Sequence, residues 1–146
     1  MKTKSLFVGS LLIATVCFSH QTETIQTQLS AESLELEEKL DARLPINSQA
    51  QVGHIKRRKI DLTHLSQPLF ILGGDPFSFN WLKEHAHELE EKHAIGFITN
   101  IDNSNRLEEF QRLIKAPLLP ANVDELLIMF HESHYPFIAH EDEIWQ

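Results

Sequence analysis

An uninterrupted apolar run that ends in two glycines constrains the fold more than any other feature of the chain. It reads PLFILGG at residues 68–74, and Asp75 and Pro76 follow it. Apolar side chains on both sides of a strand are typical of a sheet that is covered on both faces. Asp75 fits the N-cap of a helix, because its carboxylate can accept from the free amides of the first turn, and Pro76 fits the first helical position. The run therefore predicts a buried strand that turns directly into a helix.

The next elements continue an alternation of strands and helices. Leu82, Ala86 and Leu89 form one apolar stripe of the first helix, and residues 94–101 (AIGFITNI) form a second buried strand. A strand, a helix and a strand in this order predict a right-handed parallel crossover.

Further along, residues 102–105 offer caps for a helix that bears Leu107, Phe110 and Ile114. Residues 118–120 form a short strand at most. Asn122 and Glu125 have the spacing of a capping box, which predicts a third helix through Phe130. Residues 134–139 and 141–145 supply the last strands. The pattern predicts an α/β domain over residues 68–146.

The N-terminal part has a different character. Lys2 and Lys4 precede an apolar stretch, residues 6–18, that is shorter than the roughly 20 residues of a membrane-spanning helix. We therefore expect a signal peptide over residues 1–19 and export to the periplasm of a Gram-negative bacterium. Residues 20–67 are expected to hold a disordered stretch, a short amphipathic helix at 33–44 with Leu36, Leu40 and Leu44 on one face, and a linker.

Cleavage of this signal changes the composition of the chain. The only cysteine, Cys17, lies in the signal, so the mature chain contains no thiol. Its basic residues fall from 13 to 11 against 21 acidic ones, which gives a net charge near −10. Such a chain is a poor general binder of nucleic acid, and we expect no direct contact with it.

One basic cluster stands out in the expected linker, at Lys56, Arg57, Arg58 and Lys59. A solvated connector is the simpler interpretation, and proximity to an acidic membrane or partner is the alternative.

The residues offer no recognised catalytic or metal-binding pattern. His85 and His87 lie on nearly opposite faces of a helix, and His131 and His134 are three residues apart without a third ligand, so no metal site is predicted. No nucleophile elbow, Walker loop or dinucleotide-binding fingerprint is present. We therefore predict no catalytic residue and no cofactor.

The turn at residues 73–76 could suggest a phosphate site, because helix N-termini attract anions. Asp75 already places a carboxylate there and would repel a second anion. We interpret Gly73, Gly74, Asp75, Pro76 and Ser78 as a structural motif that starts the helix.

An aromatic residue before proline, Tyr135-Pro136, raises the frequency of a cis peptide bond. An apolar helix, a short link, Tyr-Pro and an apolar strand together resemble the thioredoxin fold. The resemblance implies that His134, Tyr135 and Pro136 lie beside residues 74–77, where thioredoxins carry Cys-x-x-Cys. This chain has no cysteine there, so we expect a thioredoxin-like domain without redox activity.

A second resemblance rests on Gly73, Gly74, Asp75, Pro76, Ser78, Trp81 and Leu82, together with residues 94–101 and 133–139. These stretches resemble small exported proteins of unknown biochemical function that integrating conjugative elements encode. The layout is also similar to the thioredoxin-like pilus-assembly protein of F-type conjugation. The resemblance covers about residues 52–140 and implies a part in DNA transfer through type IV secretion, with other apparatus proteins as partners. It supplies no catalytic residues.

These expectations favour a periplasmic, non-enzymatic protein-binding accessory of conjugation. The candidate partner-binding residues are Asp75, Phe77, Trp81, His134, Tyr135 and Pro136. Two alternatives remain open. One is a hydrolase-like enzyme with Asp75 and His134 as a general-base pair. The other is a small doubly wound parallel sheet that binds a ligand near Asp75, Asn100, Asp102 and Asn122. The direction of the strand at residues 137–139 distinguishes the two folds.

Overall fold

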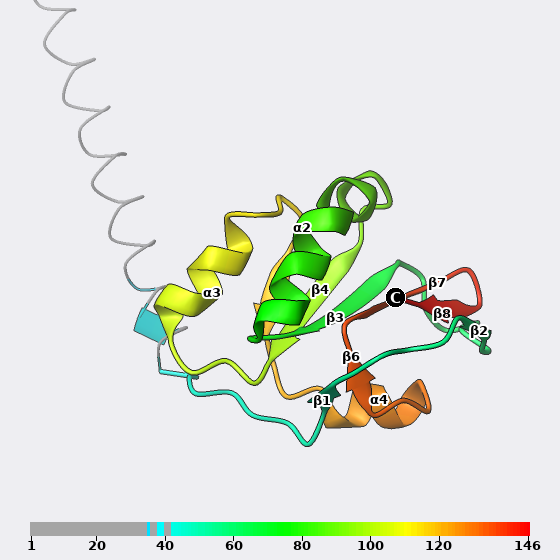
Figure 1. Ribbon diagram of the computed structural model, residues 1–146, viewed down its shortest axis with the longest axis horizontal. Coiled ribbons are helices and arrows are strands. Elements are labelled where there is room, and N and C mark those ends of the chain that lie inside the picture. Colours follow the sequence, from blue (N-terminus) through cyan, green and yellow to red (C-terminus); the bar gives the residue numbers. More distant parts are fainter. Residues whose placement is uncertain (1–34, 36–37, 40–41) are drawn as a thin grey trace, which may run out of the picture. The chain divides into compact units, whose positions relative to one another are not determined.

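The predicted strand at residues 69–73 is the centre of a six-stranded sheet. A computed structural model describes residues 35, 38–39 and 42–146. The strands are β1 (Gln51–Val52), β2 (Arg58–Lys59), β3 (Leu69–Gly73), β4 (Ile95–Thr99), β5 (Leu118–Pro120), β6 (His134–Tyr135), β7 (Phe137–His140) and β8 (Glu143–Trp145). The helices of this part are α2 (Pro76–Glu91), α3 (Ser104–Gln111) and α4 (Asp124–Met129). Figure 1 shows their arrangement.

The sheet has the order β2-β8-β7-β3-β4-β5. Strands β3, β4 and β5 are parallel, as the crossover pattern predicted. Strand β7 runs antiparallel to β3, with Phe137 opposite Ile71, and β8 and β2 continue antiparallel beyond it. The α/β class is thus confirmed, and the fully parallel doubly wound sheet is wrong. A separate parallel pair joins β1 to β6.

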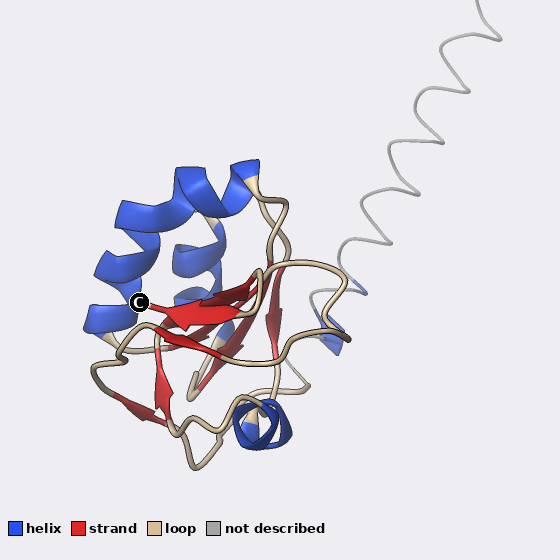
Figure 2. Cartoon of the chain, turned by 90° about the vertical axis from the view of Figure 1, so that its right-hand side faces the viewer, coloured by secondary structure: helices blue, strands red, loops and turns tan. Residues whose placement is uncertain are grey.

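Two apolar clusters fill the two faces of this sheet. On one face Phe70, Leu72 and Ile98 pack against α2 and α3 through side chains such as Leu82 and Phe110. These helices carry the stripes that the sequence predicted. Figure 2 shows α4, the lowest helix in that view, across the sheet from the other two.

The second face is covered by α4 and by residues that precede the central strand. Leu69, Ile71 and Phe137 lie in one cluster with Leu127 of α4, and Ala50, Ile55 and Leu62 join them. The sequence predicted a linker over residues 45–67 and a domain that starts at Pro68. The structure corrects both expectations, because the unit that holds the sheet spans Asp41–Gln146. Side chains elsewhere in the unit bond to the backbone of this segment, and such contacts leave no apolar period in the sequence.

Other expectations for the N-terminal part have mixed outcomes. In the first unit, Met1–Leu40, Glu35, Glu38 and Lys39 are helical and exposed. The predicted signal peptide, the disordered stretch, Leu36 and Leu40 lie outside the described residues. Leu44 is not helical and packs against the cluster under α2 and α3.

The start of α4 differs from the predicted capping box. Its N-cap is Val123, which makes no side-chain cap hydrogen bond. Asn122 instead accepts from the Asp124 amide at 2.9 Å and donates to the Asn47 carbonyl at 2.8 Å. A contact with a distant segment therefore replaces the local cap.

The β7–β8 hairpin turns through two residues in the left-handed region, Glu141 (φ 49°) and Asp142 (φ 58°). Positive φ at both central positions is the geometry of a type I′ turn, which Gly, Asn and Asp adopt more readily than Glu. Asp142 also contacts the segment before β3: its carbonyl accepts from the Ile60 amide at 2.9 Å, and its carboxylate accepts from the Leu62 amide at 3.0 Å. The hairpin tip thus anchors the segment that covers the second face.

We predict that Glu141→Asn stabilises the protein. Asn tolerates positive φ better than Glu, so we expect about 0.5–1 kcal/mol and a rise of several degrees in Tm. The Glu141 side chain is 82% exposed, so the change removes little else. Thermal unfolding followed by circular dichroism measures the effect. Glu141→Ala is the control and should give no gain; an equal gain in both variants would contradict the turn-strain explanation.

Candidate functional site

The start of α2 is built by a chain of hydrogen bonds that begins at Asp75. One oxygen of the Asp75 carboxylate accepts from the Ser78 amide at 3.0 Å, and the other accepts from the Ser78 hydroxyl at 2.7 Å. The oxygen of that hydroxyl accepts from the Gly73 amide at 3.1 Å. Asp75 is therefore the N-cap, and Pro76 follows at the first helical position, as predicted. Ser78 is fully buried and ties strand β3 to α2.

The two glycines are needed for close approach rather than for unusual backbone angles. A Cβ at Gly73 would lie 2.1 Å from Cε2 of Tyr135, and one at Gly74 would lie 2.5 Å from the Asn100 carbonyl oxygen. Neither glycine has a positive φ. The turn therefore leaves room for Tyr135 of β6 and for the loop that follows β4.

Tyr135 brings the second predicted motif to this turn. Its ring lies against Gly73, and its peptide bond to Pro136 is cis. The hydroxyl accepts from Nδ2 of Asn100 at 3.1 Å. Burial raises the pKa of the Tyr135 phenol; the hydrogen bond from Asn100 opposes this, and the negative charge of Asp75 adds to it. The predicted proximity of Tyr135 to the start of α2 is confirmed.

The six candidate partner-binding residues differ in how much of each side chain is exposed to solvent. Trp81 and Tyr135 are only 5% and 4% exposed, and Pro136 is also buried. Trp81 packs in the cluster under α2 and stacks on His85, with 4.6 Å between the ring centroids. The side chains of these three residues are buried in the fold. Phe77 is 40% exposed, and Asp75 and His134 are half-buried.

Phe77 has exposed neighbours that sequence reasoning missed. His54 meets it edge to face, with 5.6 Å between the ring centroids, and Val52 of the same segment is 47% exposed. We call Val52, His54 and Phe77 the Phe77 surface. No periodicity marks Val52 or His54, so the sequence contained no signal that could find them.

The Asp75–His134 pair of the hydrolase hypothesis does not form. The His134 ring nitrogen Nδ1 lies 3.3 Å from the Glu132 carboxylate and 3.0 Å from the Ser133 hydroxyl. Burial alone would raise the pKa of Glu132, but hydrogen bonds from Ser133 and His134 and the charge of Arg58 lower it. Both oxygens of the Asp75 carboxylate accept hydrogen bonds from Ser78. The two side chains therefore have different partners.

The proposed ligand site of a doubly wound sheet is filled by the chain itself. Asn100 accepts from the Ser48 amide at 2.8 Å and donates to the Ala50 carbonyl at 2.9 Å. Asp124 accepts from the Gln49 amide at 2.8 Å. Residues 47–50 thus lie where the parallel strands β4 and β5 end. Asp102, the remaining residue of that hypothesis, is exposed.

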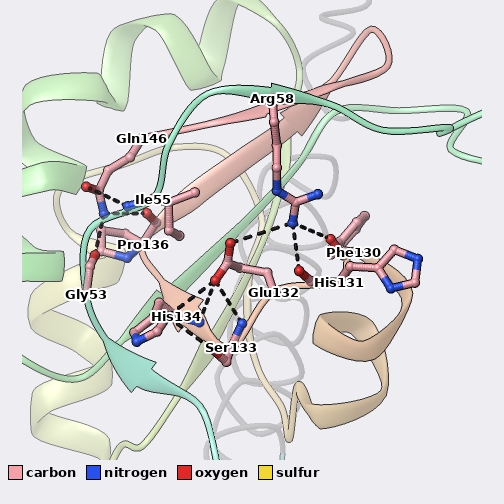
Figure 3. A network of polar contacts seen from close by, with 10 residues as sticks. All are labelled: Gly53, Ile55, Arg58, Phe130, His131, Glu132, Ser133, His134, Pro136 and Gln146. Atoms are coloured by element: carbon pink, nitrogen blue, oxygen red, sulfur yellow. Dashed lines mark hydrogen bonds and ion pairs between the residues drawn. The ribbon is translucent and has the colours of Figure 1, made fainter.

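Part of the basic cluster is used inside the fold (Figure 3). The Arg58 guanidinium donates to the carbonyls of Phe130 and His131 at 2.7 and 2.8 Å and lies 3.6 Å from Glu132. It thereby caps the C-terminus of α4, where a positive charge is favourable. Arg57 pairs with Glu143 at 2.8 Å. Lys56 and Lys59 stay exposed, so the membrane-proximity prediction rests on these two.

The described residues contain neither a metal-ligand cluster nor a membrane-spanning helix. No three His, Cys, Asp or Glu side chains of this part of the chain converge as metal ligands would. No helix within it has the length and apolar character to cross a membrane.

A family model covers nearly all of the unit that holds the sheet. Residues 9–144 match the family model described as "Protein of unknown function (DUF2859)". The chain belongs to this family. No curated protein and no solved structure matches it. The match spans the segment before β3 as well as most of the sheet.

We predict that the one tyrosine of this DUF2859 chain titrates above its ordinary value of 10.0. Because the folded pKa is raised, the neutral phenol stabilises the fold below that value, and stability is lost as the pH rises through the folded pKa. Absorbance of the phenolate follows Tyr135 directly. Asp75→Asn, which keeps a helix cap, should lower the pKa. Equal midpoints in folded and urea-unfolded protein would contradict this environment.

Proposed function

We propose that this DUF2859 chain is a non-enzymatic protein-binding module with a thioredoxin-like layout. The strand order supports this layout. A β3-α2-β4 crossover is followed by β7 antiparallel to β3, and β8 lies outside β7. Tyr135-Pro136 precedes β7 and meets the start of α2. This is the arrangement on which the sequence resemblance to thioredoxins rests.

The observation that carries the proposal is how the start of α2 is occupied. A redox protein of this layout would hold its cysteines there, and here Asp75 caps the helix while Ser78 fills the space behind it. The single cysteine of the sequence, Cys17, lies in the predicted signal peptide. Phe77 remains exposed beside His54 and Val52. An exposed aromatic residue on a rigid helix start is suited to recognition of another protein.

We further propose that the module acts in the periplasm as an accessory or assembly component of a conjugative type IV secretion system of an integrating conjugative element. This step rests on the sequence resemblance at residues 73–82 and 133–139 and on the predicted signal peptide. Its partners would be other proteins of the apparatus. The position of the gene among conjugation genes tests the process, and N-terminal sequencing of the periplasmic protein tests export, with cleavage expected near Ser19 and His20.

We predict that Phe77→Ala weakens binding of the periplasmic partner without lowering Tm. If Phe77 is the central aromatic contact, its truncation should cost about 2 kcal/mol, or roughly 30-fold in Kd, as for other aromatic hot-spot residues. Cross-linking in donor cells, followed by identification of the captured protein and by transfer frequency, measures the effect. Leu119→Ala is the matched control, because Leu119 is 49% exposed on edge strand β5. Loss of transfer in both variants, or in neither, would contradict binding at the Phe77 surface.

A further inference from the structure

The segment that carries Val52 and His54 has hydrogen bonds at every second residue. The Gln51 amide donates to the Ser133 carbonyl at 3.1 Å, and the Gly53 amide donates to the Tyr135 carbonyl at 3.0 Å. The Ile55 amide donates to Oε1 of Gln146 at 3.4 Å, while Nε2 of Gln146 donates to the Gly53 carbonyl at 2.8 Å (Figure 3). A period of two is what an extended chain produces when one of its edges is paired.

The residues between them face the other way. In an extended chain, the amide and carbonyl groups of Val52, His54 and Lys56 point away from the paired edge. Among the described residues these three amides have no acceptor, and all three residues are exposed. Residues 52–56 therefore present a short stretch of backbone with outward amides that are unpaired within the described part of the chain.

The edges of the six-stranded sheet are not open in this way. On β5, Pro120 has no amide hydrogen, and the Leu118 carbonyl accepts from the Gln111 side chain at 3.3 Å. On the opposite side β2 has only two residues, Arg58 and Lys59, and short charged strands resist pairing. The backbone at residues 52–56 contains Lys56, but among the described residues it has neither a proline nor a side chain bonded to its outward carbonyls.

Apolar side chains flank the free edge. Val52 is 47% exposed within it, and Phe77 of α2 stands beside it through the contact with His54. A strand added here would place alternate side chains against Val52 and Phe77. Main-chain hydrogen bonds and a few side-chain contacts are the components of recognition by strand addition.

We propose that residues 52–56 accept an extended segment of a partner protein as an additional strand next to β1. This inference rests on the proposed function as a protein-binding module and specifies what the module binds. The occupant is an extended peptide because the unsatisfied groups are backbone amides and carbonyls, and it carries an apolar side chain for the Val52–Phe77 contact. An acidic residue near Lys56 would add charge complementarity.

A displayed library of random peptides, selected on the full mature chain, tests the proposal. We expect enriched peptides with apolar residues at alternate positions. A synthetic peptide of the enriched sequence is then titrated against Val52→Pro, which removes an outward amide and leaves the amides of Gln51 and Gly53 in place. Affinity should fall roughly tenfold or more, as the loss of a main-chain hydrogen bond and the added ring imply. Val52→Ala is the control and should lose less, because it keeps the amide.

Hydrogen exchange provides an independent measurement on the unaltered protein. The amides of Val52 and His54 should exchange more slowly in the presence of the peptide. The proposal is overturned if no alternating peptide is enriched, if these amides stay unprotected, or if the chain pairs only with a second copy of itself. Equal binding by Val52→Pro and the unaltered chain, with loss in Phe77→Ala, would overturn strand addition and leave the proposed function standing.

Discussion

The side chain of Asn100 links the segment before β3 to strand β6. Both of its amide hydrogens and its oxygen are used, because it donates to the Ala50 carbonyl and the Tyr135 hydroxyl and accepts from the Ser48 amide. Asn100 also sits at φ 50°, a left-handed angle that Asn tolerates better than most residues. It lies directly after β4, so one residue joins the parallel strands, the segment before β3 and strand β6.

The site follows from this arrangement. With residues 47–50 fixed across the ends of β4 and β5, the crevice where open α/β sheets bind small ligands is occupied by the chain itself. Tyr135 fills the space beside Gly73, and Asp75 satisfies the start of α2. What remains accessible lies outward, on Phe77 and on the segment of Val52 and His54. These exposed residues are the ones on which the proposed binding of another polypeptide rests.

The sequence predicted the elements from β3 to α3 well, because their apolar periods and caps are local. The predicted strand at residues 134–139 is instead two strands, β6 and β7, which belong to different sheets. It also predicted that Tyr135 lies beside the start of α2. The segment before β3 was taken for a linker, since polar backbone contacts from Asn100, Asp124 and Gln146 hold it and no periodic pattern records them. Trp81 and Tyr135 were placed on a surface because an isolated motif does not reveal which aromatic side chains the core buries. The hydrogen bond from Asn122 to the Asn47 carbonyl was missed too, because it joins residues far apart in the sequence and leaves no periodic pattern.

Hydrogen exchange of residues 46–53 in Asn100→Gly and Asn100→Ala tests the central role of Asn100 most directly. Glycine keeps the left-handed angle and removes the side-chain hydrogen bonds, so exchange in this segment should accelerate while β3 and β4 stay protected. The expected loss of stability is about 2–3 kcal/mol in Asn100→Gly and roughly 1 kcal/mol more in Asn100→Ala, which also strains the backbone. Unchanged protection of residues 46–53 in Asn100→Gly would contradict the account.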